Sequence, residues 1–466
     1  MPYDPNRRQV LASTLALAAG GIGLLAPAGG RATPTTPLLS LVAERRILDV
    51  NGRAASVFGI RGPDSMAGLT LDPGQIFRVE VLNRMGEDTV IHWHGQTPPN
   101  VQDGVVETGT PLVRAGSRQL YDFVPRPGTH WMHSHHGLQE QQLMAAPLIV
   151  RTADDQRADM QEVIVLLHDF SFQDPTELFA QVTKPDASMP GMATGGPDLN
   201  DINYDAYLAN DRTLDDPQVV RTERNGRVRL RIINGATSTA FWIDLGSAKA
   251  TVLAVDGNTV QPIIGSRFPL AQGQRLDLLV EVPAGGAVPV LAQREGDRTR
   301  TGIILGAPGA TVPRIGGQAE AAALPADLSL EQRLVAATPL SPRVADVTHR
   351  VALTGTMMPY AWTLDGRDWA GHRPLRVAGG QRVVLEMVNR SPMAHPMHLH
   401  GHHFQVVGLD GVALAGAVRD TVLVPVNGSV TVAFDADNPG RWLFHCHNLF
   451  HMAAGMMTEL AYDASA

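Results

Sequence analysis

The sequence predicts an all-β protein built from three β-sandwich domains. Short runs rich in β-branched residues are separated by glycine and proline, of which the chain has 46 and 33. Short runs bounded by turn residues are typical of strands. One strand motif occurs three times, and the 466 residues correspond to about three domains of ordinary size. We therefore expect three copies of one β unit.

The first 32 residues have the pattern of an export signal. Asn6-Arg7-Arg8-Gln9 precedes an apolar run from Leu11 to Pro27, and small residues follow. This pattern indicates a twin-arginine signal peptide, and the run is short for a membrane span. We predict that residues 1–32 are recognised by the twin-arginine translocase and removed. The protein would then be bacterial, periplasmic or secreted, with no stable membrane span. An uncleaved anchor is the alternative.

The repeat defines the predicted domains. Its strand motif occupies residues 75–83, 226–234 and 381–389. Histidines lie eleven residues after the first and third copies, at His94 and His400, whereas the middle copy has Leu245 there. We predict domains at 36–154, 155–312 and 345–463, with a linker rich in Ala, Pro and Gly at 313–344. We expect a long loop over residues 184–216.

Composition excludes several classes of partner and site. The net charge is -8, and the N-terminal arginine pair is the only basic block. Nucleic acid and an anionic membrane surface are therefore not expected partners. The chain has a single cysteine, which excludes an internal disulfide. Structural zinc sites usually use several cysteines, so a zinc site is also disfavoured.

Four short clusters contain ten of the seventeen histidines. They are His92-Trp-His94, His133-Ser-His135, His395-Pro-Met-His398-Leu-His400, and the segment from His445-Cys446-His447 to His451. In a strand, alternate side chains project from the same face, so each His-X-His pair presents both rings on one side. His395 lies three residues before His398 and therefore on the opposite face. Chance surface histidines rarely produce four such clusters placed by a repeat.

The last cluster combines three kinds of soft or borderline ligand. We predict one strand from Gly440 to Met456, in which Cys446 projects to one face and both adjacent histidines project to the other. A thiolate, two imidazoles and a weak thioether suit a blue-copper electron-transfer site. Cys446, His451 and Met456 supply three of these ligands, and His395 can complete the set.

These clusters resemble the four copper motifs of the multicopper oxidases, and the resemblance covers nearly the whole chain after the signal. It implies three cupredoxin-like Greek-key domains and four copper ions, one of type 1, one of type 2 and two of type 3. It assigns type 1 to His395, Cys446 and His451 with Met456 axial, and type 2 to His92 and His398. It assigns the type 3 pair to His94, His133, His135, His400, His445 and His447.

The resemblance also implies a mechanism. Single electrons enter at type 1 copper, pass from Cys446 to its histidine neighbours, and reduce O2 to two waters at the trinuclear cluster. Asp103, nine residues after His94, matches an acid that members of the family carry near that cluster. Asp103 could instead be a turn residue, and Glu140 is a second candidate proton donor. Many laccases place an acid directly after the position of His451, where this chain has Met452.

The sequence leaves two classes of electron donor possible. An accessible type 1 site would oxidise phenols or aromatic amines, as laccases do. Met393, Met397, Met452 and Met457 lie near type 1 ligands in sequence and would suit Cu(I), which favours a periplasmic cuprous oxidase in copper resistance. The same methionines could simply pack the domain, and Ser391 occupies a position where some cuprous oxidases have an acid. A non-enzymatic copper-binding or envelope-assembly role is a third hypothesis.

Overall fold

The first strands of the chain form two four-stranded sheets. The computed structural model describes residues 37–63, 66–158, 160–184, 199–223 and 226–463, so the predicted signal segment lies outside the described residues. One sheet has the order β2 (Arg53–Arg61), β1 (Leu39–Val50), β4 (Phe77–Arg84), β6 (Arg118–Phe123). The other has the order β3 (Leu69–Leu71), β8 (Ala145–Val150), β7 (Gly128–Ser134), β5 (Ile91–His94). Alternate residues of both sheets, including Phe77 and Trp93, fill a common core.

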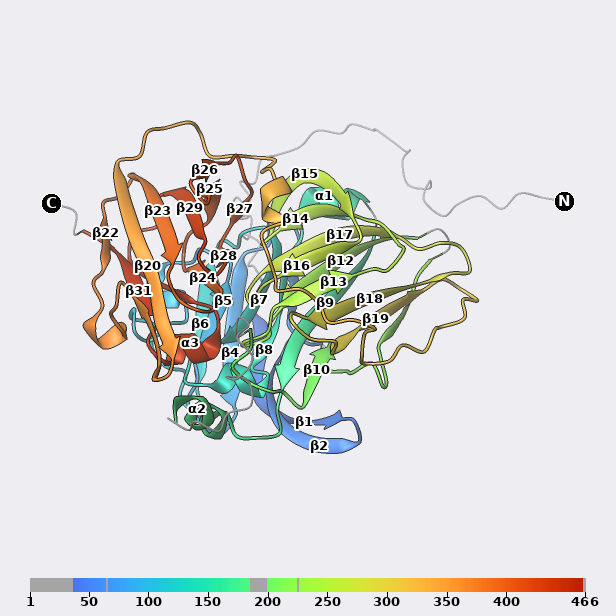
Figure 1. The fold of residues 1–466 in the computed structure, drawn as a ribbon. Coiled ribbons are helices and arrows are strands. Elements are labelled where there is room, and N and C mark those ends of the chain that lie inside the picture. The colour runs from blue at the N-terminus through green and yellow to red at the C-terminus, as the bar shows by residue number, and fades with distance from the viewer. Residues whose placement is uncertain (1–36, 64–65, 159, 185–198, 224–225, 464–466) are drawn as a thin grey trace, which may run out of the picture. The chain divides into compact units, whose positions relative to one another are not determined.

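The middle of the chain forms a second pair of sheets. The larger sheet has the order β10 (Ala206–Ala209), β9 (Gln161–Phe170), β12 (Arg227–Asn234), β17 (Arg275–Glu281), β14 (Ala250–Val255), β15 (Asn258–Gly265). The smaller has the order β11 (Val219–Arg221), β19 (Arg300–Gly306), β18 (Ala287–Arg294), β13 (Phe241–Asp244), β16 (Arg267–Leu270). These strands appear in green to yellow in Figure 1.

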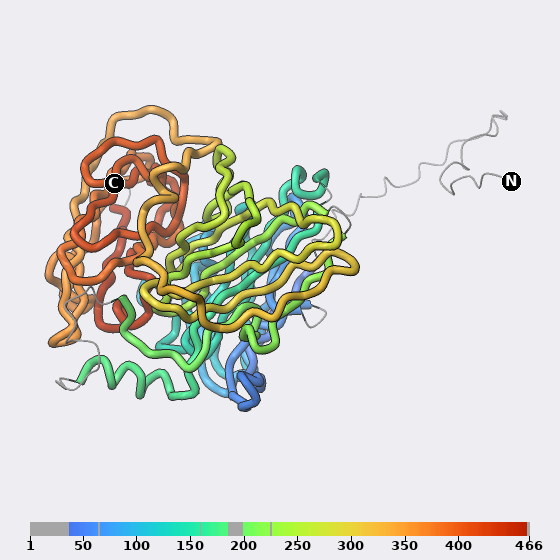
Figure 2. The backbone as a smooth tube through the Cα atoms, turned by 45° about the vertical axis from the view of Figure 1, so that its right-hand side comes forward, coloured from blue at the N-terminus to red at the C-terminus, as the bar shows by residue number. Residues whose placement is uncertain are grey.

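A third pair of sheets follows the linker. One sheet has the order β21 (Tyr360–Leu364), β20 (Val347–Met357), β23 (Arg382–Asn389), β29 (Ser429–Asp435), β25 (Phe404–Leu409), β26 (Val412–Ala413), with β27 (Val418–Arg419) beside β25. The other has the order β22 (Leu375–Val377), β31 (Met457–Tyr462), β30 (Arg441–Cys446), β24 (His395–Leu399), β28 (Thr421–Val424). In Figure 2 the chain passes from the yellow middle sheets to these orange and red strands. Isolated bridges at Ala323 and Ala336 attach the linker to the middle sheets.

Helices are short and lie between strands. The α-helices are α1 (Ala153–Ala158), α2 (Pro175–Thr183) and α3 (Leu449–Ala453). The 3₁₀ turns are η2 (Asn100–Gln102), η3 (Gln139–Gln142), η4 (Glu331–Arg333) and η5 (Trp369–Gly371). The predicted all-β fold class, with Greek-key sandwich domains, is confirmed.

The three copies of the repeat occupy the same place in their sheets. β4, β12 and β23 each pair in parallel with the first long strand of their group and antiparallel with a later strand. Each copy ends in a buried asparagine, at Asn83, Asn234 and Asn389. In all three, Oδ1 accepts a hydrogen bond from the amide two residues on, and Nδ2 donates to two backbone carbonyls. The repeated Asn therefore forms the same corner three times.

Two local predictions were wrong. The strand predicted from Gly440 to Met456 ends at Cys446, because Asn448 accepts hydrogen bonds from the amides of Phe450 and His451 and starts α3. Within the predicted loop over 184–216, residues 185–198 lie outside the described residues, and the prediction fails at β10, whose backbone pairs with β9 and whose Leu208 is buried. Residues 206–209 are a short apolar run, and they form a strand because they pair with β9 in the folded protein.

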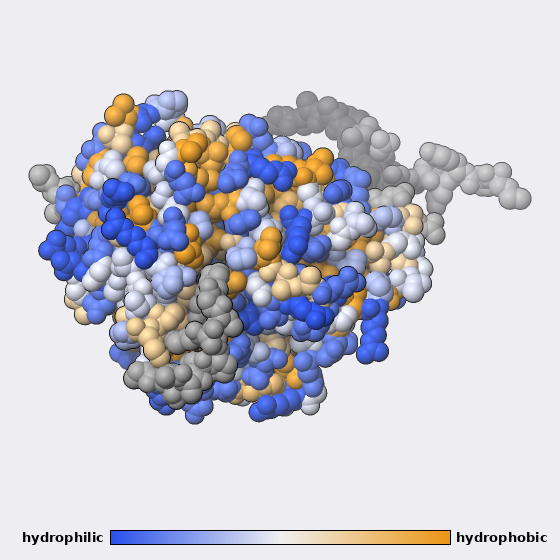
Figure 3. Space-filling view, in the orientation of Figure 1, coloured by the Kyte–Doolittle hydropathy of each residue, from blue (hydrophilic) through white to orange (hydrophobic). Residues whose placement is uncertain are grey.

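None of the helices among the described residues has the length and hydropathy needed to cross a membrane. Figure 3 shows hydrophobic and hydrophilic side chains interspersed on the visible face. Such mixing is typical of protein surfaces, where many exposed atoms are apolar.

Candidate metal centre

Two adjacent strands of the first pair of sheets present histidines on one face. β5 pairs antiparallel with β7, and the register places His92 opposite His133. Residues directly opposite each other project from the same side of an antiparallel pair. Trp93 and Met132, which alternate with these histidines, lie in the core. The histidines therefore point away from the core of the first sheets.

β24 and β30 repeat this arrangement in the last pair of sheets. Their register places His398 opposite His445 and Met397 opposite Cys446. Met397, Phe444 and Cys446 belong to the hydrophobic core of these sheets. The two histidines therefore share one face of the sheet, and the thiol lies on the other face. The expected division of the strand into two faces holds as far as Cys446.

Eight histidines from these two regions meet in one buried cluster. The ring nitrogens of three sets lie within 4.8 Å of one another: His94, His133 and His447; His135, His400 and His445; and His92, His94 and His398. The close nitrogen pairs are 3.3 Å apart for His94 and His447, 3.0 Å for His400 and His445, and 3.4 Å for His92 and His398. Two nitrogens bound to one ion at about 2 Å are separated by about 3 Å. Each set therefore has the geometry of a metal site.

Burial keeps these rings in the form that binds metal. Desolvation, followed by repulsion from neighbouring positive groups, lowers the pKa well below its usual value for His94, His133, His135, His398, His400 and His447. It lowers the pKa of His445 to about 4. Among the described residues, Nε2 of His133 and of His135 has no hydrogen-bond partner. Such buried atoms usually have a partner, and a metal ion would supply it here.

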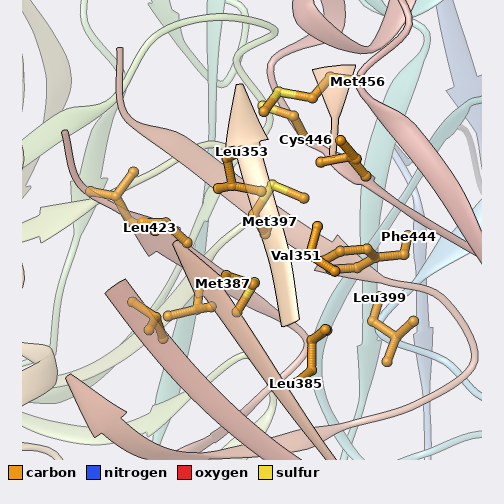
Figure 4. Packing of buried hydrophobic residues seen from close by; sticks show 14 of the residues in the cluster. Val351, Leu353, Leu385, Met387, Met397, Leu399, Leu423, Phe444, Cys446 and Met456 are labelled. Carbon is orange, nitrogen blue, oxygen red and sulfur yellow. The ribbon is translucent and has the colours of Figure 1, made fainter. Parts of the chain in front are cut away.

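A second set of ligand atoms surrounds the cysteine. Cys446 Sγ lies 3.5 Å from His395 Nδ1 and 3.6 Å from His451 Nδ1, and these two nitrogens are 3.1 Å apart. Figure 4 shows Met456 beside Cys446, and both side chains are fully buried. Burial raises the pKa of the Cys446 thiol, but a bound metal would deprotonate it. The set contains the thiol, imidazole and thioether groups of a blue-copper site.

Sequence comparison identifies the family that carries these sets. Three family models, each described as multicopper oxidase, match residues 43–155, 161–301 and 342–466. The multicopper oxidase MmcO of Mycobacterium tuberculosis is 33% identical over 456 residues, which cover 94% of this chain and 88% of that protein. The chain belongs to the multicopper oxidase family. It is an oxidoreductase that uses oxygen, and its metal is copper.

Other relatives of this multicopper oxidase have names of two kinds. A copper resistance protein A homolog of Pseudomonas syringae pv. tomato is 26% identical, with 89% of this chain and 90% of that protein covered. Laccase-2 of Podospora anserina is 27% identical, and the match covers 90% of this chain and 75% of that protein. The solved structure of Fet3p, described as a multicopper oxidase that functions in iron import, has a TM-score of 0.78 at 17% identity. The structural match covers 92% of this chain and 90% of the Fet3p chain, and it supports the same fold for both.

The two acids predicted to donate protons both touch the histidine cluster. His400 Nδ1 donates to Asp103 Oδ2 at 2.9 Å, and His92 Nδ1 donates to the Asp103 carbonyl at 2.8 Å. His133 Nδ1 donates to Glu140 Oε2 at 2.9 Å. Burial, with a smaller contribution from the charge of Asp169, raises the pKa of Glu140 well above its usual value. These contacts direct the opposite nitrogen of each ring towards its ligand set.

The sequence pattern gave no sign of a buried ion pair at the same cluster. His94 Nε2 donates to Asp420 Oδ1 at 3.1 Å, so His94 Nδ1 is directed towards His447. Arg275 Nη1 lies 2.7 Å from Asp420 Oδ1, and Nη2 contacts Oδ2. Burial raises the pKa of Asp420, but the charge and hydrogen bonds of Arg275, together with the charges of His403 and His398, outweigh it and hold the pKa below its usual value. Arg275 begins β17 of the middle sheets, and no histidine motif marks it.

A second acid that was not predicted lies at the cysteine-centred set. Asp201 Oδ2 is 3.2 Å from His451 Nε2 and accepts a hydrogen bond from Asn448 at 2.9 Å. Its side chain is fully buried and also interacts with Tyr360. Burial, and then the charge of Asp201, raises the pKa of the nearby Tyr360 well above its usual value. Asp201 lies in the stretch predicted as a loop, where sequence periodicity carried no signal.

Four methionines lie close in sequence to the predicted type 1 ligands, and their exposure divides them into a buried pair and a partly exposed pair. Met393 is 3% exposed and Met397 is fully buried, and both pack in the core of the last sheets. Met452 and Met457 are partly exposed. Ser391 is buried, and its Oγ lies 2.6 Å from His395 Nε2. Ser391 thus orients His395 and is not available at the surface.

Proposed function

We propose that this multicopper oxidase is laccase-like, oxidising phenols or aromatic amines by single electrons and reducing O2 to two waters. Four copper ions would bind: one of type 1 at His395, Cys446, His451 and axial Met456; one of type 2 at His92 and His398; and a type 3 pair at His94, His133, His135, His400, His445 and His447. The observation that carries this proposal is the connection between the two ligand groups through Cys446. Its chain neighbours, His445 and His447, belong to the histidine cluster.

Copper bound at these positions would supply one-electron redox chemistry at the thiolate and reduction of O2 at the histidine cluster. The chain itself supplies the route between them. A few covalent bonds join Cys446 Sγ to the rings on either side. His445 Nδ1 also donates a hydrogen bond of 2.9 Å to the Cys446 carbonyl, which shortens the route to that ring.

Reduction of O2 consumes protons, and two buried carboxyl groups are suited to deliver them. Asp103 contacts His92 and His400, and Glu140 contacts His133. We assign Asp103 as the main proton donor because it contacts rings of both the type 2 set and the type 3 set. Glu140 would serve as a second donor and would orient His133.

Asp201 supports a phenolic or aromatic amine donor. A donor must place its π-system against a type 1 ligand and lose a proton as it loses an electron. The Asp201 carboxylate is fully buried against His451 Nε2 and Tyr360, and we propose that the donor's proton reaches it along these side chains. The burial of Met393 and Met397 favours packing roles for them, which weakens the support for a Cu(I) site at type 1.

A cuprous oxidase remains the second candidate function. Relatives named copper resistance protein A support it. The partly exposed Met452 lies on the helix that carries His451, and the partly exposed Met457 begins β31, the strand that follows it. In that case Cu(I) itself would be the reductant.

We also propose domain limits and a location. Domains at 36–154, 155–312 and 345–463, joined by a linker at 313–344, are supported by the three pairs of sheets. A twin-arginine signal over residues 1–32 would direct the protein to the periplasm or the outside of a bacterial cell. N-terminal sequencing of the exported protein tests both the cleavage and the location.

Oxygen uptake by the copper-loaded protein tests the donor. A methoxyphenol should support faster uptake than Cu(I), and Asp201→Asn should slow the phenol reaction by about 100-fold, in the range of general-base effects. Ferrocyanide, which releases no proton, is the matched control donor and should be oxidised equally by both proteins. Faster uptake with Cu(I), unchanged by Asp201→Asn, would instead establish the cuprous oxidase.

A further inference from the structure

A cavity of about 270 Å³ leads from the surface to one ligand of the histidine cluster. His135 lies in its wall together with Met452, Met457, Leu443, Phe179 and Glu107. His135 is 8% exposed, whereas the other seven histidines of the cluster are at most 2% exposed. The cavity therefore reaches the cluster at its most accessible ligand.

Two thioethers lie in this wall, next to the same ligand set. Met457 pairs with His445 across β30 and β31, so the two side chains project from the same face of the sheet. His445 and His135 belong to one ligand set, together with His400. Met452 lies on α3 and is partly exposed, as is Met457. The exposed carboxylate of Glu107 adds a negative charge to the wall.

The chemistry of this wall differs from that of an ordinary apolar cavity. Thioethers bind Cu(I) in preference to harder ions. Methionines that serve only as packing are buried, as Met393 and Met397 are in this chain. A partly exposed pair beside the most accessible imidazole of the cluster, whose buried Nε2 has no described hydrogen-bond partner, can instead hold an ion briefly and release it to the stronger nitrogen ligands.

We propose that this cavity is the site through which Cu(I) enters the trinuclear position. Cu(I) binds Met452 and Met457, exchanges onto His135, and moves into the set completed by His400 and His445. No electron is transferred in this exchange, because thioether ligands are simply replaced by imidazole. The inference rests on the proposed trinuclear role of these histidines. It concerns how the metal is acquired and not which donor is oxidised.

The experiment measures copper uptake by the metal-free full chain under anaerobic conditions. A buffered Cu(I) chelate is added, and protein-bound copper is measured over time after desalting. Met452→Leu combined with Met457→Leu keeps the volume and apolar character of both side chains. Met66→Leu changes an exposed methionine in the first sheets and serves as the matched control. Thermal melting of each apo variant verifies folding.

The double variant should take up Cu(I) about ten to 100-fold more slowly and reach the same final copper content. Uptake of Cu(II), which depends less on thioethers, should change much less. Equal Cu(I) rates in the wild type and the double variant would overturn the proposal. So would normal uptake combined with a raised KM for O2, because the cavity would then be an oxygen route. Failure to oxidise phenols would overturn the proposed donor and leave the uptake result standing.

Discussion

In several of the clustered imidazoles the two ring nitrogens have separate tasks. One nitrogen faces a candidate ligand set, and the other donates a hydrogen bond that selects the tautomer. His398 donates to the Asp420 carbonyl, and His94 donates to the carboxylate of the same residue. His94 is therefore held with Nδ1 towards the cluster, whereas His398 is held with Nε2 towards it. Asp420 accordingly sets the orientation of two ligands.

Replacement of Met456 tests the axial position at type 1 copper. Met456→Leu should raise the type 1 reduction potential, because loss of a thioether donor destabilises the oxidised ion more than the reduced one. A redox titration of the blue absorption band measures the change. Met397→Leu, a buried methionine of the same core, is the control and should shift the potential less. An unchanged potential in Met456→Leu would contradict the axial assignment.

Replacement of Asp103 tests the proton donor. Asp103→Asn keeps an acceptor for His400 Nδ1 but removes the ionisable group, so reoxidation of the reduced enzyme by O2 should slow by about 100-fold. Stopped-flow absorption separates this step from reduction of type 1 copper, which should keep its rate. Glu140→Gln is the comparison variant with a smaller expected effect. If only Glu140→Gln slows reoxidation, the assignment of the main donor is wrong.

At the scale of elements, the middle sheets form part of the site although their repeat has no histidine. The turn between β16 and β17 packs against the cluster and carries Gly273, and Arg275 follows it at the start of β17. Gly273 has a φ of +77°, and a Cβ on it would lie 2.7 Å from Cδ2 of His447. Arg275 neutralises Asp420. The middle sheets thus contribute shape and charge to a centre whose proposed metal ligands come from the other two pairs of sheets.

A methyl group at this turn should disturb the type 3 pair. Gly273→Ala combines an unfavourable φ with a clash on His447, so we expect lost type 3 copper and at least about tenfold lower turnover. Gly246→Ala is the matched control, since Gly246 has a φ of +62° and a Cβ added to it would meet no atom within 4 Å. Copper analysis and the near-ultraviolet band of the type 3 pair measure the effect. Equal losses in both variants would point to backbone strain and not to the His447 contact.

At the scale of the whole molecule, the cluster depends on the docking of separate sheets. His92 and His398 face each other at 3.4 Å but lie 306 residues apart in sequence. Asn100 of the first sheets also donates a hydrogen bond to the Arg441 carbonyl of the last sheets. Bound copper would join these regions directly, and its binding free energy would add to that of folding.

Copper removal should therefore lower the melting temperature of the enzyme by several degrees. Binding at 100 times the dissociation constant stabilises the native state by about 2.7 kcal/mol per site. Differential scanning calorimetry of holo and chelator-treated protein measures the difference. Cys446→Ser, which removes the type 1 thiolate, should keep most of the shift. Loss of the whole shift in Cys446→Ser would show that type 1 copper supplies the stabilisation.

Local periodicity was sufficient for the strand motif and for the division of the candidate ligand residues between two faces of a strand. Side-chain direction along a strand depends on neighbouring residues alone, so His445 and Cys446 could be placed on opposite faces before any fold was known. The family follows from the same clusters. Local periodicity failed after Cys446, where the Asn448 cap starts a helix that brings His451 back to the thiol.

Long-range docking decided the surroundings of the ligands. Arg275 and Asp420 are 145 residues apart, and Asp201 and Asn448 are 247 residues apart. Such pairs have no common spacing or periodicity in the chain. Burial also decided which methionines can contact a ligand. Met393 and Met452 both lie near predicted type 1 ligands in sequence, but Met393 is buried and Met452 is partly exposed. Spacing along the backbone predicts which faces bind metal, whereas packing between sheets determines charge, access and proton supply.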